Sequence, residues 1–232
     1  MKHPIVLGIT GASGAIYAVR LLEVLRATGR DVHLSISSSG RDVILQELEL
    51  RVDLNSFNPA SLLEEGGTAH ESKIPLLKTS GETSNPKPTP VSQQMAVAGK
   101  LQYYHHQDFM APMASGSFLT GGMVICPTSG TTLSAVAAGA AGNLIQRAAE
   151  VHLKERRKLI LIPREAPLSL AHIDNMRRVT EAGAVVIPAS PGWYHGVRSI
   201  RDLVDFVVAR ICDQLGVEHG LMKRWGENKN DQ

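Results

Sequence analysis

The sequence is poor in cysteine and in aromatic residues, and it contains no long apolar run. Its two cysteines, Cys126 and Cys212, form no CxxC pair, which excludes a disulfide framework and predicts two buried, reduced thiols. No window approaches the roughly 20 apolar residues of a membrane span, and the apolar stretch near the N-terminus is too short for a signal peptide. We therefore expect a cytoplasmic protein without a membrane span.

An excess of charge of one sign is also missing. Lys and Arg number 24 and Asp and Glu number 22, and the basic residues are scattered apart from a short run at 154–158. No nucleic-acid partner is therefore expected. Hydrophobic residues make up 43% of the 232 residues, which is ordinary for a globular chain, so a small-molecule partner is the expectation.

Short apolar runs alternate with helical patterns along most of the chain. They predict strands at 4–8, 32–37, 123–126, 159–163 and 185–188. Apolar residues at helical spacing predict helices over 16–25, 43–50, 143–157, 170–182 and 200–215, and a helix of small residues within 128–142. This alternation predicts one α/β domain with an open, mostly parallel sheet flanked by helices and a ligand crevice at the carboxyl ends of the strands.

The segment from 51 to 100 breaks this alternation. It is rich in proline and small polar residues towards its end, and it holds a single aromatic residue, Phe57. A segment with so few core-forming side chains cannot offset the entropy that it would lose on ordering. We therefore predict a mobile loop over about 72–95 within a single domain that spans 1–232.

Glycine and hydroxyl residues follow the strands predicted at 4–8, 32–37 and 123–126. At helix N-termini, free N–H groups and the helix dipole favour an anion. The GxGxxG spacing is absent and no carboxylate closes the second strand to hold a ribose, so FMN fits better than NAD. The turns at 11–14 and 129–132, each taken alone, are equally well explained as helix N-caps. The residues concerned are Gly11, Ala12, Ser13, Ser37, Ser129, Gly130, Thr131 and Thr132.

Charged residues fall into two groups. Arg164 and Glu165 directly follow the strand at 159–163, at the edge where ligand crevices form, so we predict a functional role for them. Arg147, Glu150 and Lys154 share one face of a helix, and a solvated charged face is the better explanation for Glu150.

Two other classes of site find little support. His105, His106 and Asp108 lack a further ligand at a supporting spacing, so loop polarity explains them better than a metal site. No GxSxG elbow is present, which argues against hydrolase chemistry.

Longer stretches resemble the UbiX-type flavin prenyltransferases. The resemblance rests on GITGASGAIYAVRLLEVL, APMASGSF, MVICPTSGTTLSAVAAGAAGNLIQRAAEVHLKERRKLILIPREAPLSLAHIDNM, GAVVIPASPGWYH and DLVDFVVARICDQLG, in the family's order. It covers all but about 51–100 and implies a Rossmann-like flavoprotein fold and a homo-oligomer, usually a dodecamer. It also implies metal-free transfer of a dimethylallyl group from dimethylallyl monophosphate to reduced FMN. The family's product, prenylated FMN, serves a UbiD-type decarboxylase.

The resemblance also implies roles for individual residues. The turns named above and Arg164 match positions that contact FMN, and Tyr194 and Arg210 match positions that bind the dimethylallyl phosphate. Glu165 resembles the family's proton-transfer group. Further residues match positions that line the active site or reach the substrate; these are Glu47, Arg147, Lys154 and Trp225.

The pattern of the helix predicted at 200–215 indicates where Arg210 lies relative to the buried face of that helix. With a buried stripe of Ile200, Leu203, Val204, Val207 and Ile211, Arg210 falls at the edge of the stripe, where it could reach an anion together with Tyr194. A snorkelling arginine is the alternative explanation.

Two departures from the family stand out. The segment before Lys100 is longer and richer in proline than expected, and Phe109 replaces a Trp of several members. Because a phenyl face stabilises a cation less than an indole does, the second departure concerns rate. Two alternative functions stay open, an FMN-dependent cysteine decarboxylase and a non-catalytic flavin carrier, although the PASANT-type motif of the decarboxylases is replaced here by PASPGWYH.

Overall fold

A six-stranded sheet forms the centre of the computed structural model, which describes residues 3–63, 72–77 and 97–222. The strand order is β3-β2-β1-β4-β5-β6, and all five pairings are parallel. The expected α/β fold with an open parallel sheet is confirmed. The strands are β1 (Ile5–Ile9), β2 (Val32–Ile36), β3 (Leu101–Tyr103), β4 (Gly122–Thr128), β5 (Leu159–Pro163) and β6 (Val185–Val186).

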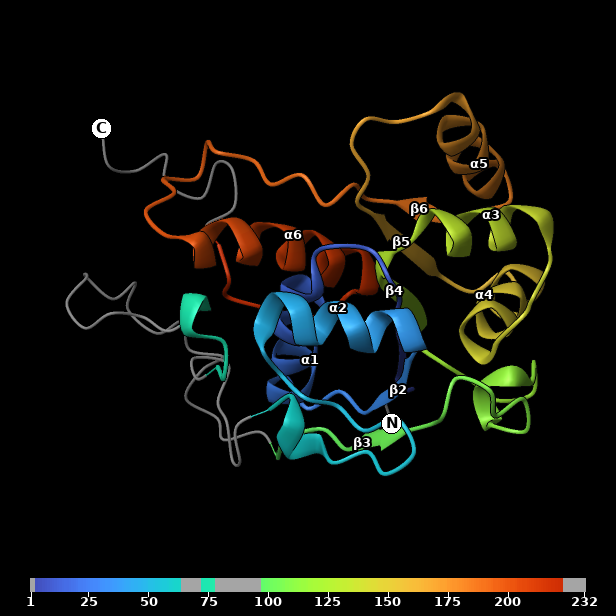
Figure 1. Ribbon diagram of the computed structural model, residues 1–232, viewed down its shortest axis with the longest axis horizontal. Coiled ribbons are helices and arrows are strands. Elements are labelled where there is room, and N and C mark those ends of the chain that lie inside the picture. Colours follow the sequence, from blue (N-terminus) through green and yellow to red (C-terminus); the bar gives the residue numbers. More distant parts are fainter. Residues whose placement is uncertain (1–2, 64–71, 78–96, 223–232) are drawn as a thin grey trace.

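Helices cover both faces of the sheet (Figure 1). One face carries α1 (Ala15–Ala27), α2 (Ser38–Leu48) and α6 (Ile200–Leu215), whose apolar residues join Ile5, Leu7 and Ile9 of β1 in one core cluster. The other carries α3 (Gly130–Ala138), α4 (Leu144–Lys154) and α5 (Leu170–Glu181), packed with Val6. Alternate residues of a strand point to opposite faces, so β1 serves both cores. Short 3-10 helices lie at η1 (Pro59–Ser61), η2 (Pro75–Leu77) and η4 (Pro112–Ala114).

Several boundaries differ from those predicted. Helix α2 begins at Ser38 rather than at 43, because the Ser37 side chain accepts the Gly40 N–H and caps it there. Strand β4 continues past the predicted stop, with Pro127 inside it and a cis peptide bond before that proline. Strand β3, whose three residues pair with β2, was not predicted from the sequence.

The predicted mobile loop is wrong over 72–77; residues 78–95 lie outside the described part of the chain. Ile74 and Leu77 are 1% and 0% exposed and belong to the same core cluster as α1 and α6. Leu54, Leu62 and Leu63 of the preceding segment are also buried in it. Sparse aliphatic residues were enough to anchor this segment, because each of them is inserted into an existing core rather than forming one.

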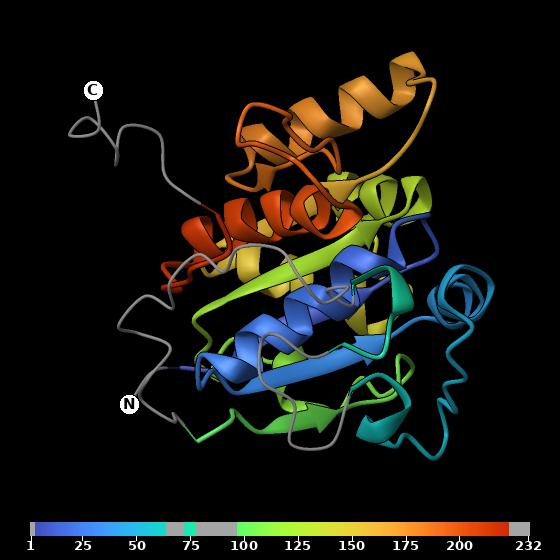
Figure 2. The same ribbon diagram turned by 90° about the vertical axis from the view of Figure 1, so that its left-hand side faces the viewer.

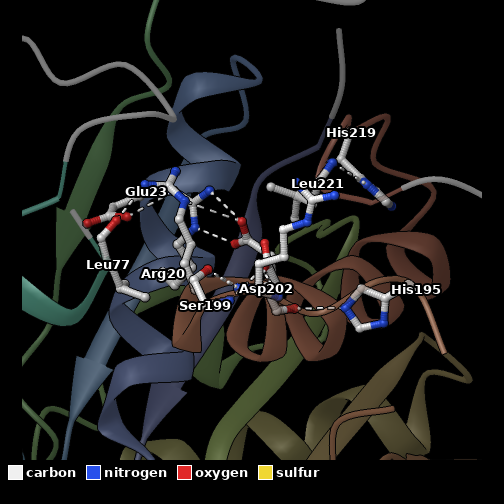
Figure 3. A network of polar contacts seen from close by, with 11 residues as sticks. Arg20, Glu23, Leu77, His195, Ser199, Asp202, His219 and Leu221 are labelled. Atoms are coloured by element: carbon white, nitrogen blue, oxygen red, sulfur yellow. Dashed lines mark hydrogen bonds and ion pairs between the residues drawn. The ribbon is translucent and has the colours of Figure 1, made fainter. Parts of the chain in front are cut away.

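Helices α1 and α6 lie side by side across the sheet and share a buried network of charges (Figures 2 and 3). Arg20 of α1 donates from Nε to Asp205 of α6 at 2.6 Å and from Nη1 to Glu23 at 3.1 Å. Arg201 pairs with Asp205 at 3.5 Å and donates to the carbonyl of Leu77 at 2.6 Å. Burial raises the pKa of Glu23, although Ser72 and Arg20 act against it. The network thus joins both helices to the 72–77 segment.

The network also corrects the stripe predicted on the last helix. Ile200 is 48% exposed, whereas Arg201 and Asp205 are 8% and 7% exposed. Val204, Val207 and Ile211 are buried as predicted. A stripe inferred from apolar residues alone missed the two charged residues because their charges are compensated inside the protein.

Asp205→Asn tests this network. The substitution removes the buried carboxylate that faces both Arg20 and Arg201, while Glu23 still pairs with Arg20. Breaking a buried pair in this way costs about 3–5 kcal/mol. We expect that loss in the free energy of unfolding measured with denaturant. The matched control is Asp174→Asn, which removes an exposed pair with Arg177 (3.9 Å) and should change stability by less than about 1 kcal/mol. Equal effects of the two substitutions would contradict the assignment.

Candidate active site

Three helices begin close together at the carboxyl edge of the sheet. The turns after β1, β2 and β4 lead into α1, α2 and α3, and β1 lies between β2 and β4 in the sheet. A Cβ at Gly11 would collide with Ser39, so the absence of a side chain lets the first turn pack against the start of α2. The predicted FMN-contacting turns therefore surround one point of the sheet edge.

The starts of α2 and α3 have the same hydrogen-bonding pattern. Ser37 accepts the N–H of Gly40, and Ser129 accepts the N–H of Thr132. The N–H groups that lie between each capping serine and the residue that donates to it, such as those of Ser39 and Gly130, have no partner within their own helix. The helix-cap and anion-site explanations of these turns are therefore compatible. Each serine caps its helix, and the other N–H groups of the first turn can still donate to a bound anion or carbonyl oxygen.

The start of α1 differs from the prediction. The carboxylate of Glu47, on α2, accepts the N–H of Gly14 at 2.9 Å and that of Ala15 at 2.9 Å. The anion at the start of α1 is therefore a side chain of the protein itself. A bound phosphate could still use the starts of α2 and α3 and the Gly11–Ser13 turn. The position places Glu47 beside the predicted cofactor residues.

Thr10 connects two of these turns, and the sequence analysis missed it. Its hydroxyl donates to the carbonyl of Pro127 at 2.7 Å and accepts the N–H of Ser129 at 2.9 Å. The side chain is 2% exposed. Thr10 thus fixes the turn after β1 against the turn after β4. A hydroxyl residue at the end of an otherwise apolar strand was the signal available in the sequence.

Arg164 and Glu165 follow β5 and are exposed at the same sheet edge. Arg164 is close enough to Tyr17 of α1 to act on it electrostatically. Burial raises the pKa of Tyr17, Cys126 adds to the rise and Arg164 opposes it. Glu165 lines a small pocket with Gly130 and with His172 of α5, which the sequence analysis did not single out.

Tyr194 and Arg210 lie on the α6 side of the molecule. The ring of Tyr194 packs edge-on against Phe206 of α6, with ring centroids 5.7 Å apart, and Arg210 follows Phe206 by one helical turn. Arg210 pairs with Asp213 at 3.1 Å, so its guanidinium already has a carboxylate neighbour. The Tyr194 ring therefore packs on Phe206, one turn before Arg210, but Asp213 competes with any bound anion for Arg210. Trp225 lies outside the described residues.

Arg147 and Lys154 lie on the opposite face of the sheet. Both belong to α4, where Arg147 pairs with Glu150 at 2.9 Å and Lys154 pairs with Glu155. Because the sheet separates α4 from α6, one chain does not bring these cations to Arg210. Phe109, which is 44% exposed, lies shortly before η4, and η4 packs on α4.

The histidine pair at 105–106 is also placed differently from the prediction. His106 lies in a turn, as expected, but its side chain is 9% exposed, and its Nε2 lies 3.2 Å from the hydroxyl of Ser38 at the start of α2. Burial lowers its pKa, and His105 and Arg41 lower it further. The two rings pack against each other with centroids 4.4 Å apart.

The parallel sheet in 3-2-1-4-5-6 order and the donors at its carboxyl edge define a nucleotide-binding α/β protein. The sequence profile of the Flavoprotein family matches residues 1–212. The flavin prenyltransferase UbiX of Pseudomonas aeruginosa is 44% identical over 224 residues, which are 96% of this chain and 94% of that protein. The chain belongs to the flavoproteins and, among them, to the UbiX flavin prenyltransferase family.

Two solved structures extend the comparison. The structure of AnUbiX (PadA1) in complex with FMN and dimethylallyl pyrophosphate has a TM-score of 0.74 and 32% identity, covering 97% of this chain and 98% of that one. A dodecameric FMN-dependent UbiX-like decarboxylase from Escherichia coli O157:H7 has a TM-score of 0.71 and 33% identity, covering 97% and 99%. No described helix is long and apolar enough to cross a membrane.

Thr10→Val tests how the turns are held together. Valine keeps the shape but removes the hydroxyl, which leaves the Ser129 N–H without its acceptor, so we expect FMN affinity to fall about tenfold. Flavin fluorescence titration measures it. Thr28→Val is the control, because Thr28 bonds only to carbonyls of its own helix, at its far end. Unchanged affinity in Thr10→Val would show that the two turns do not need this bridge.

Proposed function

We propose that this protein transfers the dimethylallyl group of dimethylallyl monophosphate to reduced FMN. The observation that carries the proposal is the set of hydrogen-bond donors at the starts of α2 and α3, opposite a carboxyl at the end of β5, in a chain 44% identical to a flavin prenyltransferase. Bound reduced FMN supplies the ring that accepts the prenyl group. The remaining chemistry is positioning and proton transfer by the protein.

Each side chain has a proposed task. The Ser37 and Ser129–Thr132 turns and the Gly11–Ser13 turn bind the flavin through N–H and hydroxyl groups, and Arg164 holds its polar edge. Glu47 keeps the first turn closed through the N–H groups that it accepts. Glu165 moves the proton that prenyl transfer releases, since its carboxyl is exposed at the sheet edge.

The second phosphate site needs more than one copy of the chain. We assign Tyr194 and Arg210 to the dimethylallyl phosphate, and Arg147 and Lys154 to the same site in a neighbouring copy. The supporting observation is that the sheet separates the two groups within one chain. A homo-oligomer, with the dodecamer of the Escherichia coli relative as its proposed form, would bring them together. Trp225 is assigned to the same substrate by resemblance alone.

The proposed product is a modified cofactor, which calls for a recipient. A UbiD-type decarboxylase is the recipient that the family resemblance implies. A flavin carrier would need no phosphate site besides that of FMN, so the second phosphate site that the family resemblance implies at Tyr194 and Arg210 supports a transferase over a carrier. The cysteine decarboxylase is not favoured, because the relatives that match nearly the full chain are named flavin prenyltransferases.

Mass spectrometry of the released flavin tests the function. The protein is incubated anaerobically with reduced FMN and dimethylallyl monophosphate, and in parallel with the diphosphate. A mass gain of one prenyl unit supports the transferase, and the faster of the two donors decides between mono- and diphosphate. Unchanged FMN with both donors would reject the transferase and leave the carrier and decarboxylase functions.

Glu165→Gln tests the proton-transfer role. The amide keeps the shape of the carboxyl but takes up no proton, so prenylated FMN should form about 10²–10⁴ times more slowly. FMN affinity should stay at the parental value. Glu181→Gln, on the exposed side of α5, is the control and should leave turnover unchanged. Full turnover in Glu165→Gln would assign the proton to another group.

A further inference from the structure

His172 sits in the first turn of α5 with its two ring nitrogens in different surroundings. The N–H of Ser169 points to Nδ1 at 3.2 Å, and the Ser169 hydroxyl lies 3.0 Å from the same nitrogen. A backbone N–H can only donate, so Nδ1 is the acceptor and the neutral ring carries its proton on Nε2. The helix cap therefore selects the tautomer of this histidine.

The protonated nitrogen faces the pocket that holds Glu165. A Cβ at Gly130 would stand 3.0 Å from Nε2 of His172 and 4.0 Å from Oε2 of Glu165, so both atoms approach the same point over the start of α3. The pocket is otherwise walled by apolar side chains such as Leu133, Leu168 and Met176. Few other groups there can accept the Nε2 proton, and Glu165 is the charged one.

We infer that His172 is a positioning residue that directs its Nε2–H at the Glu165 carboxylate and holds that carboxylate facing the pocket. The inference rests on the proposed function only in that Glu165 is taken to transfer the proton. Nδ1 of His172 accepts the Ser169 N–H, so Nε2–H is the ring group left to face Glu165. The proton passes to a Glu165 oxygen and from there to solvent. Gly130 is part of the arrangement, since any side chain there would crowd the imidazole.

Two substitutions separate this role from helix capping. Gln and Glu are both usual partners of a capping serine at this helix position, so His172→Gln and His172→Glu should both keep the cap of α5. Gln retains a donor for Glu165, whereas Glu removes the donor and adds a like charge. Ser169→Ala weakens the cap but leaves the Ser169 N–H on Nδ1, and serves as the control for stability alone.

Two measurements are made on each full-length protein. The first is labelling of Glu165 by a water-soluble carbodiimide with glycine ethyl ester at one fixed pH, followed by peptide mass spectrometry. This reagent reacts with the protonated carboxyl, so loss of the donor should speed labelling at least fivefold in His172→Glu and not in His172→Gln or Ser169→Ala. The second is kcat for prenylated FMN, which should fall at least tenfold in His172→Glu with FMN affinity unchanged and be largely restored in His172→Gln.

The outcomes distinguish the inference from the proposed function. If His172→Gln and His172→Glu behave alike in labelling, His172 only caps the helix and the inference is overturned, even where the parent forms product. If labelling differs as expected but the parent forms no prenylated FMN, the contact with Glu165 stands and the proposed function fails.

Discussion

The ion pair between Arg20 and Asp205 holds the α1–α6 face of the molecule together. It lies under two helices that are far apart in the sequence, with both side chains removed from solvent. A buried charge cannot be solvated by water if its partner moves away, so a change in the distance between α1 and α6 would be costly. The start of α1 and the Arg210 turn of α6 are thereby held in a fixed relation, and the Leu77 carbonyl extends this order to the segment before β3.

The cofactor edge is built mainly from backbone. Its donors are N–H groups at helix starts, and the side chains around them set where each helix begins rather than supplying charge. Ser37 and Ser129 fix the first turns, and Thr10 fixes one turn against the next. Such an edge binds through geometry that does not change with pH. Glu165, to which we assign proton transfer, follows a different strand of the same sheet.

Much of this arrangement could be predicted from sequence, and the failures have physical causes. The parallel α/β order and the helix start at Ser129 follow from alternating apolar runs and local capping chemistry, whereas the start of α2 at Ser38 lay five residues before the predicted one. Local patterns contain no information on compensated charge, so Arg201 and Asp205 were missed as core residues. Nor do they show which face of the sheet a helix covers, and that fact separates Arg147 and Lys154 from Arg210. His172 was missed because its role depends on a contact with Gly130, 42 positions earlier.

The carboxylate of Glu47 gives the resting protein a built-in counter-ion. A helix start left open behaves as a general anion trap, and sulfate or inorganic phosphate would compete for it with any cofactor. At the start of α1 the Glu47 carboxylate prevents that competition. It is part of α2, so dilution or dialysis cannot remove it. The edge therefore discriminates against small free anions partly because the Glu47 carboxylate already occupies one of the three helix starts.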